Sequence, residues 1–389
     1  MSDISNAPLT RGRALRYLWP LDWSKLTVNH GSFGAAPLAV LEEQDRWRGL
    51  MEAQPTYFMG KTLPGALRSA ADALARFVGA DGKDLVFVDN ATTAINAVLG
   101  SLPLGQGDEI LTLTDTYGAV VKTARHIVGR CGAKIVTAAM TFPDPDYTAL
   151  LNNIDAAFSA GTKLAIIDHI TSPTALVLPV AEIIALCHSR GVPVLIDGAH
   201  APGHLPLDLT ALDADWYVGN CHKWLMSAKG AGFLWSRPDR QAGLHPTVIS
   251  HGYEDGYLAE FDWTGTRDPS AYLTVPAAIA FHNELGGVAH MQANRDLAWE
   301  AAERIAERFG TRIGAGRNQH CAMSTVLLPD NAPRTPDEMH KLRSRLLDLG
   351  CDAQLTFQDG KSWMRLSVQA YNELEDFDRV ASLILKTLA

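Results

Sequence analysis

The chain has 389 residues, which suggests about two domains, each large enough to bury a core without disulfides or metals. Hydrophobic residues make up 47% and charged residues 20%, so a disordered chain and a coiled coil are excluded. Lys and Arg number 34 against 43 Asp and Glu, and the net charge of −9 argues against nucleic acid or an anionic membrane as the main partner.

The short runs of β-branched residues from residue 84 onward alternate with longer stretches of helical periodicity. The expected strands are 85–88, 109–113, 134–137, 163–167, 192–196, 216–218 and 232–235. The expected helices between them lie near 91–101, 117–131, 147–160 and 180–190. This alternation predicts an α/β fold, with a mostly parallel sheet and helices on both faces.

The pattern changes after residue 268. It predicts a long helical stretch (272–309), a strand (322–328), a helix (336–349), a strand (362–367) and a closing helix from Leu374. We therefore expect three parts: an N-terminal segment (1–34) that contributes to the active site, a large α/β domain (35–268) and a small α+β domain (269–389).

The five cysteines form an odd set without a C-x-x-C pair, so neither a disulfide framework nor a zinc site is indicated. Residues 1–25 contain no apolar core of a signal peptide, and no window approaches the roughly 20 apolar residues of a membrane span. We therefore expect a cytoplasmic protein with no membrane partner.

In an open parallel sheet, ligands bind beyond the carboxyl ends of the strands. The first expected strand is followed by Asn90, a candidate N-cap, and by Thr92 and Thr93, whose hydroxyl and N–H groups suit a phosphate at the positive end of a helix. A Thr-rich helix cap without a ligand explains the same residues. No glycine-rich dinucleotide or triphosphate loop occurs here.

Three more chemically suggestive residues follow later strands. Tyr117 opens a helix and either packs in the fold or lays its ring against a flat cofactor. Asp197 follows an apolar run, where a carboxylate is costly unless a cation or hydrogen-bond donors meet it, although a turn cap is the alternative. Lys223 lies in a tight loop beside an aromatic residue, where desolvation would lower its pKa, although most lysines are solvated.

The combination matters more than any one residue. A phosphate-type helix start, a stacking aromatic, a buried acid and a loop lysine match the needs of pyridoxal 5′-phosphate. Its phosphate needs donors and its ring needs a face partner. Its pyridine nitrogen needs an anion to stay protonated, and its aldehyde needs an amine.

Six motifs carry a family resemblance: NHGSFG (29–34), NATTAIN (90–96), DGAH (197–200), NCHKW (220–224), WTGTR (263–267) and RLS (365–367). With them the sequence resembles the class V aminotransferase family of fold-type I pyridoxal phosphate enzymes over nearly the whole chain. It looks most like the isopenicillin N epimerase-like branch. The motifs are specific for fold and cofactor and weak for the type of reaction.

By that resemblance, Lys223 forms the internal aldimine, Asp197 pairs with the pyridinium nitrogen and His200 lies near the ring hydroxyl. Tyr117 stacks on the ring, where related desulfurases carry a His, and Ser172 makes a polar contact to the ring hydroxyl. Lys229, six residues past Lys223, is a rival for the covalent link that the motif disfavours.

The resemblance also places residues around the phosphate: Thr92, Thr93, Asn220 and His222. Asn220 stands where many relatives have Ser. Thr266 matches a residue that reaches the phosphate of the neighbouring subunit, so the resemblance implies a homodimer with shared sites.

Arg365 in the small domain suits the α-carboxylate of an amino-acid substrate, because its planar guanidinium can form a bidentate pair. A structural salt bridge is the alternative. Asn29, just before the large domain, would help at the same carboxylate.

Removal of the α-proton by Lys223 is the expected common step. An epimerase-like reaction then needs a second proton donor, for which Tyr117, His30, Tyr57 and His251 are unranked candidates. β-Elimination, as in C–S lyases, and transamination are the enzymatic alternatives. A non-catalytic binding protein that retains the fold is the alternative of another class.

Cysteine desulfuration would need a mobile nucleophilic cysteine. The loop around Cys321 superficially resembles the desulfurase cysteine loop, but it precedes the strand and helix that the family's loop follows. We therefore expect Cys321 and Cys351 to be structural.

Overall fold

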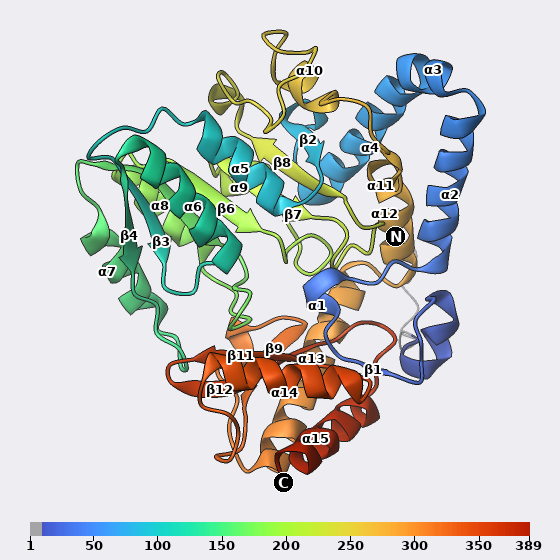
Figure 1. Cartoon of the computed structure of the whole chain (residues 1–389), viewed down its shortest axis with the longest axis vertical. Coiled ribbons are helices and arrows are strands. Elements are labelled where there is room, and N and C mark those ends of the chain that lie inside the picture. Colours follow the sequence, from blue (N-terminus) through green and yellow to red (C-terminus); the bar gives the residue numbers. More distant parts are fainter. Residues whose placement is uncertain (1–9) are drawn as a thin grey trace, which may run out of the picture.

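The computed structural model describes residues 10–389, so the first nine residues of the predicted N-terminal segment lie outside the described residues. Figure 1 shows a large α/β domain with a smaller C-terminal α+β domain below it. No helix within 10–389 is long and apolar enough to cross a membrane.

The centre of the large domain is a seven-stranded sheet in the order β2-β8-β7-β6-β5-β3-β4. Its strands are β2 (Leu85–Val88), β3 (Glu109–Leu113), β4 (Lys134–Ala138), β5 (Thr162–Asp168), β6 (Val194–Gly198), β7 (Trp216–Asn220) and β8 (Gly232–Ser236). Neighbouring strands are parallel except that β8 runs antiparallel to both β2 and β7. The expected mostly parallel sheet is confirmed.

Helices cover both faces of this sheet. Successive side chains of a strand point to opposite faces, so a strand that is apolar throughout needs a packed layer on each side. In β5, Ala165 and Ile167 pack with the core that includes α4, α7 and α8, whereas Leu164 and Ile166 pack with the core that includes α5 and α6. The helices of the large domain are α2 (Leu38–Ala53), α3 (Pro55–Tyr57), α4 (Leu63–Val78), α5 (Ala91–Ser101), α6 (Gly118–Cys131), α7 (Tyr147–Ala157), α8 (Val180–Ser189), α9 (Leu209–Leu212) and α10 (Tyr257–Asp262).

The C-terminal domain contains a three-stranded antiparallel sheet in the order β11-β12-β9. Its strands are β9 (Met323–Leu327), β11 (Gln354–Gln358) and β12 (Lys361–Ser367), and its helices are α13 (Val288–Phe309), α14 (Pro336–Asp348) and α15 (Leu374–Leu388). The N-terminal segment joins this domain, because β1 (Leu26–Thr27) pairs with β10 (Cys351–Asp352). The short helix α1 (His30–Phe33) then leads toward the large domain.

The expected long helical stretch over 272–309 is helical over most of its length but is not one helix. The structure divides it into α11 (Ser270–Leu273), α12 (Val275–Glu284) and α13, with Gly286 and Gly287 at positive φ between the last two. Glycine adopts such φ values without steric cost, so this pair ends one helix and starts the next. α11 and α12 pack against α2 and α4, whereas α13 packs against α15 and β9.

Candidate active site

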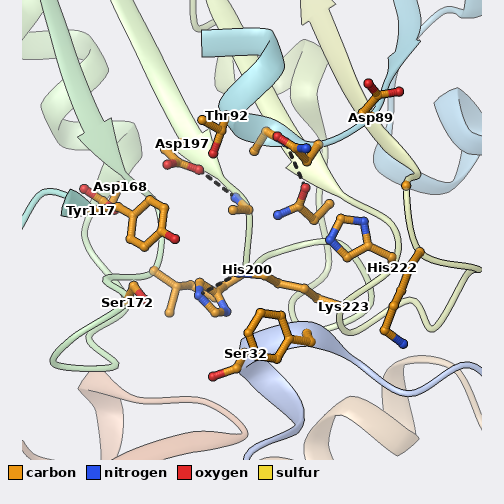
Figure 2. Close-up of a pocket in the computed structure, with 18 residues that line it drawn as sticks. Ser32, Asp89, Thr92, Tyr117, Asp168, Ser172, Asp197, His200, His222 and Lys223 are labelled. Atoms are coloured by element: carbon orange, nitrogen blue, oxygen red, sulfur yellow. Dashed lines mark hydrogen bonds between the residues drawn. The ribbon is translucent and has the colours of Figure 1, made fainter. Parts of the chain in front are cut away.

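A cavity of about 360 Å³ opens at the carboxyl ends of the central strands. Eight of the ten residues that the family resemblance assigns to the cofactor line it: Thr92, Tyr117, Ser172, Asp197, His200, Asn220, His222 and Lys223. They come from the carboxyl ends of β6 and β7 or from the segments that follow β2, β3, β5, β6 and β7, so the sheet brings them together. Ser32 of α1 faces them from the opposite side of the cavity (Figure 2).

The N-terminus of α5 forms one end of the cavity. Asn90 is its N-cap and accepts a hydrogen bond from the Thr93 backbone N–H at 3.0 Å. Asn220 Oδ1 accepts the Ala91 N–H at 2.8 Å, which leaves the Asn220 amide nitrogen as a donor at the cavity. The helix dipole, the Thr92 side chain and this amide favour an anion here.

His222 lies beside this helix end. Its Nδ1 donates to the Ala231 carbonyl at 2.9 Å, so Nε2 remains available to a ligand. The pKa of His222 is lowered to about 4, mainly by burial and in part by the neighbouring charge of Lys223. His222 is therefore neutral in the protein before an anion binds.

Lys223 lies in the loop after β7, and burial lowers its pKa to about 8. The charge of Arg365 acts in the same direction, whereas Asp197 opposes it. Lys223 Nζ is 3.2 Å from His200 Nε2, and His200 Nδ1 accepts the indole N–H of Trp224 at 3.3 Å. Because the indole can only donate, the neutral ring of His200 carries its proton on Nε2, the nitrogen that faces the Lys223 amine.

Lys223 is also fixed through its backbone. His30 Nε2 donates to the Lys223 carbonyl at 3.1 Å, and the Tyr371 hydroxyl lies 2.9 Å from His30 Nδ1. Gly34, at φ 70°, comes so close that an added side chain would collide with the His222 carbonyl. The N-terminal segment therefore packs directly on the loop that carries the lysine.

Asp197 is the last residue but one of β6 and is buried. It accepts the Ala199 N–H at 3.0 Å. Burial raises the pKa of Asp197, and the Ala199 amide and the charge of Lys223 partly offset this effect. A cation placed in the cavity would favour its charged form.

Arg365 lies at the edge of the cavity, where it contacts the lining residues Ser32 and Ser172. Its Nη1 donates to the Ser172 carbonyl at 2.6 Å and lies 3.3 Å from Ser172 Oγ, and its Nη2 donates to Asn29 Oδ1 at 3.2 Å and to Ser32 Oγ at 3.0 Å. Its Nε has no partner, and no carboxylate pairs with it among residues 10–389. Burial lowers the pKa of Arg365 to about 10, which still leaves the guanidinium charged at neutral pH. An anion bound beside it would stabilise this buried cation.

Two predicted cofactor residues lie outside this cavity. Thr93 lines a neighbouring small pocket, because α5 turns its side chain away from Thr92. Thr266 is exposed, and its proposed contact with a second subunit stays a prediction. Asn29 is buried, where it accepts from Arg365 and donates to Asp352.

Of the four candidates for a second proton donor, only Tyr117 lines the cavity. His30 is buried against Tyr371 and the Lys223 backbone, so both of its ring nitrogens are occupied. Tyr57 is 62% exposed, and it and His251 lie outside the cavity lining. Tyr117 is half exposed.

Neither expected structural cysteine reaches the cavity. Cys321 and Cys351 are buried, and burial raises the pKa of each thiol to about 12. A buried thiol with a raised pKa is a poor nucleophile.

The cavity also contains residues that the sequence reasoning missed, among them Asp168, Asp89 and Ser32. Asp168 follows an apolar run at the end of β5 just as Asp197 follows one at the end of β6. The signal that identified Asp197 was therefore present for Asp168 as well. Lys229, the rejected rival, lies exposed at the rim of the same cavity.

These side chains fit pyridoxal phosphate. The α5 N-terminus, Thr92, Asn220 and His222 can hold the phosphate, and the buried Asp197 can pair with the ring nitrogen. The Lys223 amine, whose pKa is lowered to about 8, can bind the aldehyde, and Tyr117 can contact a ring face. The buried donors and the acid thus match the opposite ends of one flat, anionic molecule.

Comparison with known proteins agrees with this fit. The aminotransferase class-V family matches residues 36–380. The chain is 34% identical to a protein of Oryza sativa subsp. japonica provisionally named L-cysteine desulfhydrase 1, over 93% of this chain and 83% of that protein. It is 30% identical to isopenicillin N epimerase of Streptomyces clavuligerus, over 96% of each.

A solved structure of the cystine C–S lyase C-DES with its product cysteine persulfide superimposes with a TM-score of 0.80 at 23% identity, over 92% of this chain and 97% of that chain. This likeness confirms the fold. The chain belongs to the class V aminotransferase family of pyridoxal phosphate enzymes.

Proposed function

We propose that this enzyme is a C–S lyase that removes the α-proton of a small amino acid and expels a sulfur leaving group from its β-carbon. The observation that carries the proposal is the cavity, whose 360 Å³ must hold both cofactor and substrate. This volume is at the lower end of the range for ligand sites, which favours a substrate such as cysteine over a bulky one. The desulfhydrase name of the rice relative agrees with this choice.

Bound pyridoxal phosphate supplies the electron sink that makes the α-proton acidic. Arg365 binds the substrate carboxylate and thereby orients the Cα–H bond, while Asn29, Ser32 and Ser172 hold the guanidinium. Lys223, whose pKa burial lowers to about 8, would take the α-proton in its unprotonated form. Loss of sulfide from the β-carbon, followed by hydrolysis, would give pyruvate and ammonia.

Elimination needs one proton-transfer group at Cα, and Lys223 supplies it. Epimerisation is the second candidate reaction. It needs a proton donor on the face opposite Lys223, and among the four residues considered for this role Tyr117 alone lines the cavity. The predicted epimerase activity therefore depends on the Tyr117 hydroxyl. Transamination requires Lys223 alone, and its product distinguishes it from elimination and from epimerisation.

The test incubates holoenzyme with L-cysteine, and separately with other L-amino acids, in deuterated water. We expect pyruvate and sulfide in equal amounts, both abolished in Lys223→Ala and retained in Lys229→Ala, the matched variant of the exposed rim lysine. Deuterium at Cα of recovered substrate with loss of chirality, abolished in Tyr117→Phe, would instead establish the epimerase. Formation of pyridoxamine phosphate and a keto acid would establish a transaminase.

We also propose a homodimer in the cytoplasm. Support comes from the exposed Thr266 close to Arg267, whose guanidinium pairs with the cavity residue Asp89 at 2.8 Å. The five cysteines are free, which agrees with a reducing compartment. Sedimentation equilibrium gives the subunit number, and a monomer that retains full activity would contradict the shared site.

A further inference from the structure

Asp168 is the unexplained acid of the cavity. It is the last residue of β5, and it is the register partner of Asp197 in the parallel pairing of β5 with β6. Side chains of register partners on parallel strands point to the same face of the sheet. Asp168 and Asp197 therefore stand side by side, and both line the cavity (Figure 2).

The Asp168 carboxyl is buried, with 3% of the residue exposed, and its Oδ2 has no hydrogen-bond partner. No cation pairs with it within the described part of the chain. The ionisable groups that act on it are Asp197 from β6 and Asp115 from the segment after β3, while Lys223 acts on Asp197. Burial and the charge of Asp197 both raise the pKa of Asp168 well above its usual range.

We propose that Asp168 is a cofactor-binding residue in the form of a neutral carboxylic acid, which donates a hydrogen bond from Oδ2 to the molecule held in the cavity. Two adjacent buried carboxyls cannot both be ionised without a strong penalty. A backbone N–H lowers the pKa of each acid, but only Asp197 also faces the charge of Lys223, so Asp197 is the one that carries the negative charge. Asp168 keeps the proton.

This division suits a cationic heterocycle. One carboxylate neutralises one ring cation, and a second carboxylate would leave an excess negative charge in a buried place. A protonated Asp168 adds a donor without adding charge, as apolar surroundings allow a carboxylic acid to do at neutral pH. The ligand would also satisfy the Oδ2 atom that the protein leaves without a partner.

The first experiment is infrared difference spectroscopy of the apoprotein at pH 7, wild type against Asp168→Asn. We expect the wild type to show the carbonyl stretch of a protonated carboxylic acid that the variant lacks. Asp84→Asn is the matched control, because Asp84 is buried, burial raises its pKa and it lies outside the cavity lining. Its spectrum must keep the band that Asp168→Asn removes.

The second experiment titrates apoprotein with pyridoxal phosphate and follows the intrinsic tryptophan fluorescence. Asp168→Asn retains a neutral donor of the same shape, so its dissociation constant should stay within about twofold of the wild type. Asp168→Leu removes the donor and should raise the dissociation constant about five- to tenfold, the effect of one lost hydrogen bond.

A wild-type spectrum without the band, or a tenfold loss of affinity in Asp168→Asn, would show that Asp168 is ionised and overturn the proposal. An unchanged affinity in a folded Asp168→Leu would show that Asp168 does not contact the ligand and would overturn it as well. If Asp168→Leu does not fold, the infrared band and Asp168→Asn still decide. The inference rests on cofactor binding, not on the lyase reaction, so an absence of pyruvate refutes only the proposed reaction.

Discussion

The two sides of the cavity differ in the protonation states of their ionisable side chains. On the side formed by the central sheet, burial shifts ionisable groups toward their neutral forms: Lys223, His222 and Asp168. On the side formed by the N-terminal segment and the small domain, Arg365 stays cationic among neutral oxygens of Asn29 and Ser32. The sheet side can exchange protons at neutral pH, whereas the Arg365 side can only bind and orient.

The largest predicted effect is on turnover and comes from changing Lys223, on the side of the cavity formed by the central sheet. Lys223→Ala should lower turnover by a factor on the order of 10³, because a positioned acid–base group contributes roughly 10²–10⁴. Steady-state release of pyruvate measures the loss. Lys229→Ala serves as the control, since it removes an amine from the rim of the same cavity, and an equal loss in both variants would contradict the role of Lys223.

A smaller effect is expected from the Arg365 side. Arg365→Lys keeps the positive charge and loses the planar fork, so KM should rise roughly 10- to 100-fold, the effect of one lost hydrogen bond to a charged group. Turnover at saturation should fall much less. Arg312→Lys, on an exposed ion pair with Asp144, is the control, and a variant in which kcat alone falls would argue against carboxylate binding.

The two sides also differ in their effect on apoprotein stability. Burial lowers the pKa of Lys223 from 10.5 to about 8. Above pH 10.5 the amine is neutral in the folded and the unfolded chain and costs no stability. As the pH falls from 10.5 to 8, the unfolded chain binds the proton more readily, so the free energy of unfolding decreases. Below pH 8 the full cost of roughly 3 kcal/mol applies. Lys223→Met should therefore stabilise the apoprotein at pH 7 and make little difference near pH 10.5.

Urea unfolding of apoprotein at both pH values checks this prediction. A pH-independent gain in stability would mean that Lys223→Met acts through packing alone and not through loss of a buried charge.

The smallest expected effect is that of Ser172→Ala. It removes only the hydroxyl that lies 3.3 Å from Arg365, and the Ser172 carbonyl remains as a stronger acceptor at 2.6 Å. KM should rise about two- to fivefold, as for one weak hydrogen bond. A loss as large as that of Arg365→Lys would show instead that the Ser172 hydroxyl contacts the substrate or the cofactor directly.

The same contrast explains what the sequence could predict. Residues on the sheet side follow strands, and the carboxyl ends of parallel strands meet, so Thr92, Asp197 and Lys223 could be placed together from local patterns. Arg365 and Asn29 are 336 residues apart and meet only through the tertiary fold, so no local pattern joins them. Only the family resemblance indicated that they act at one place.

The fold was predicted best where the sequence has strong periodicity. The seven strands of the central sheet lie within about two residues of their expected positions, because each is an apolar run between turns. β11 was missed, since it is an edge strand whose residues are mostly half-buried and its pattern is weak. The break in 272–309 depends on two glycines whose positive φ no periodicity reveals.

The contacts of His30 with Tyr371 and with the Lys223 carbonyl join positions that are 341 and 193 residues apart along the chain. During synthesis on a ribosome these three positions emerge at very different times. The reactive lysine loop therefore gains this support only after Tyr371 has left the exit tunnel, well after the strands that flank the loop have been made.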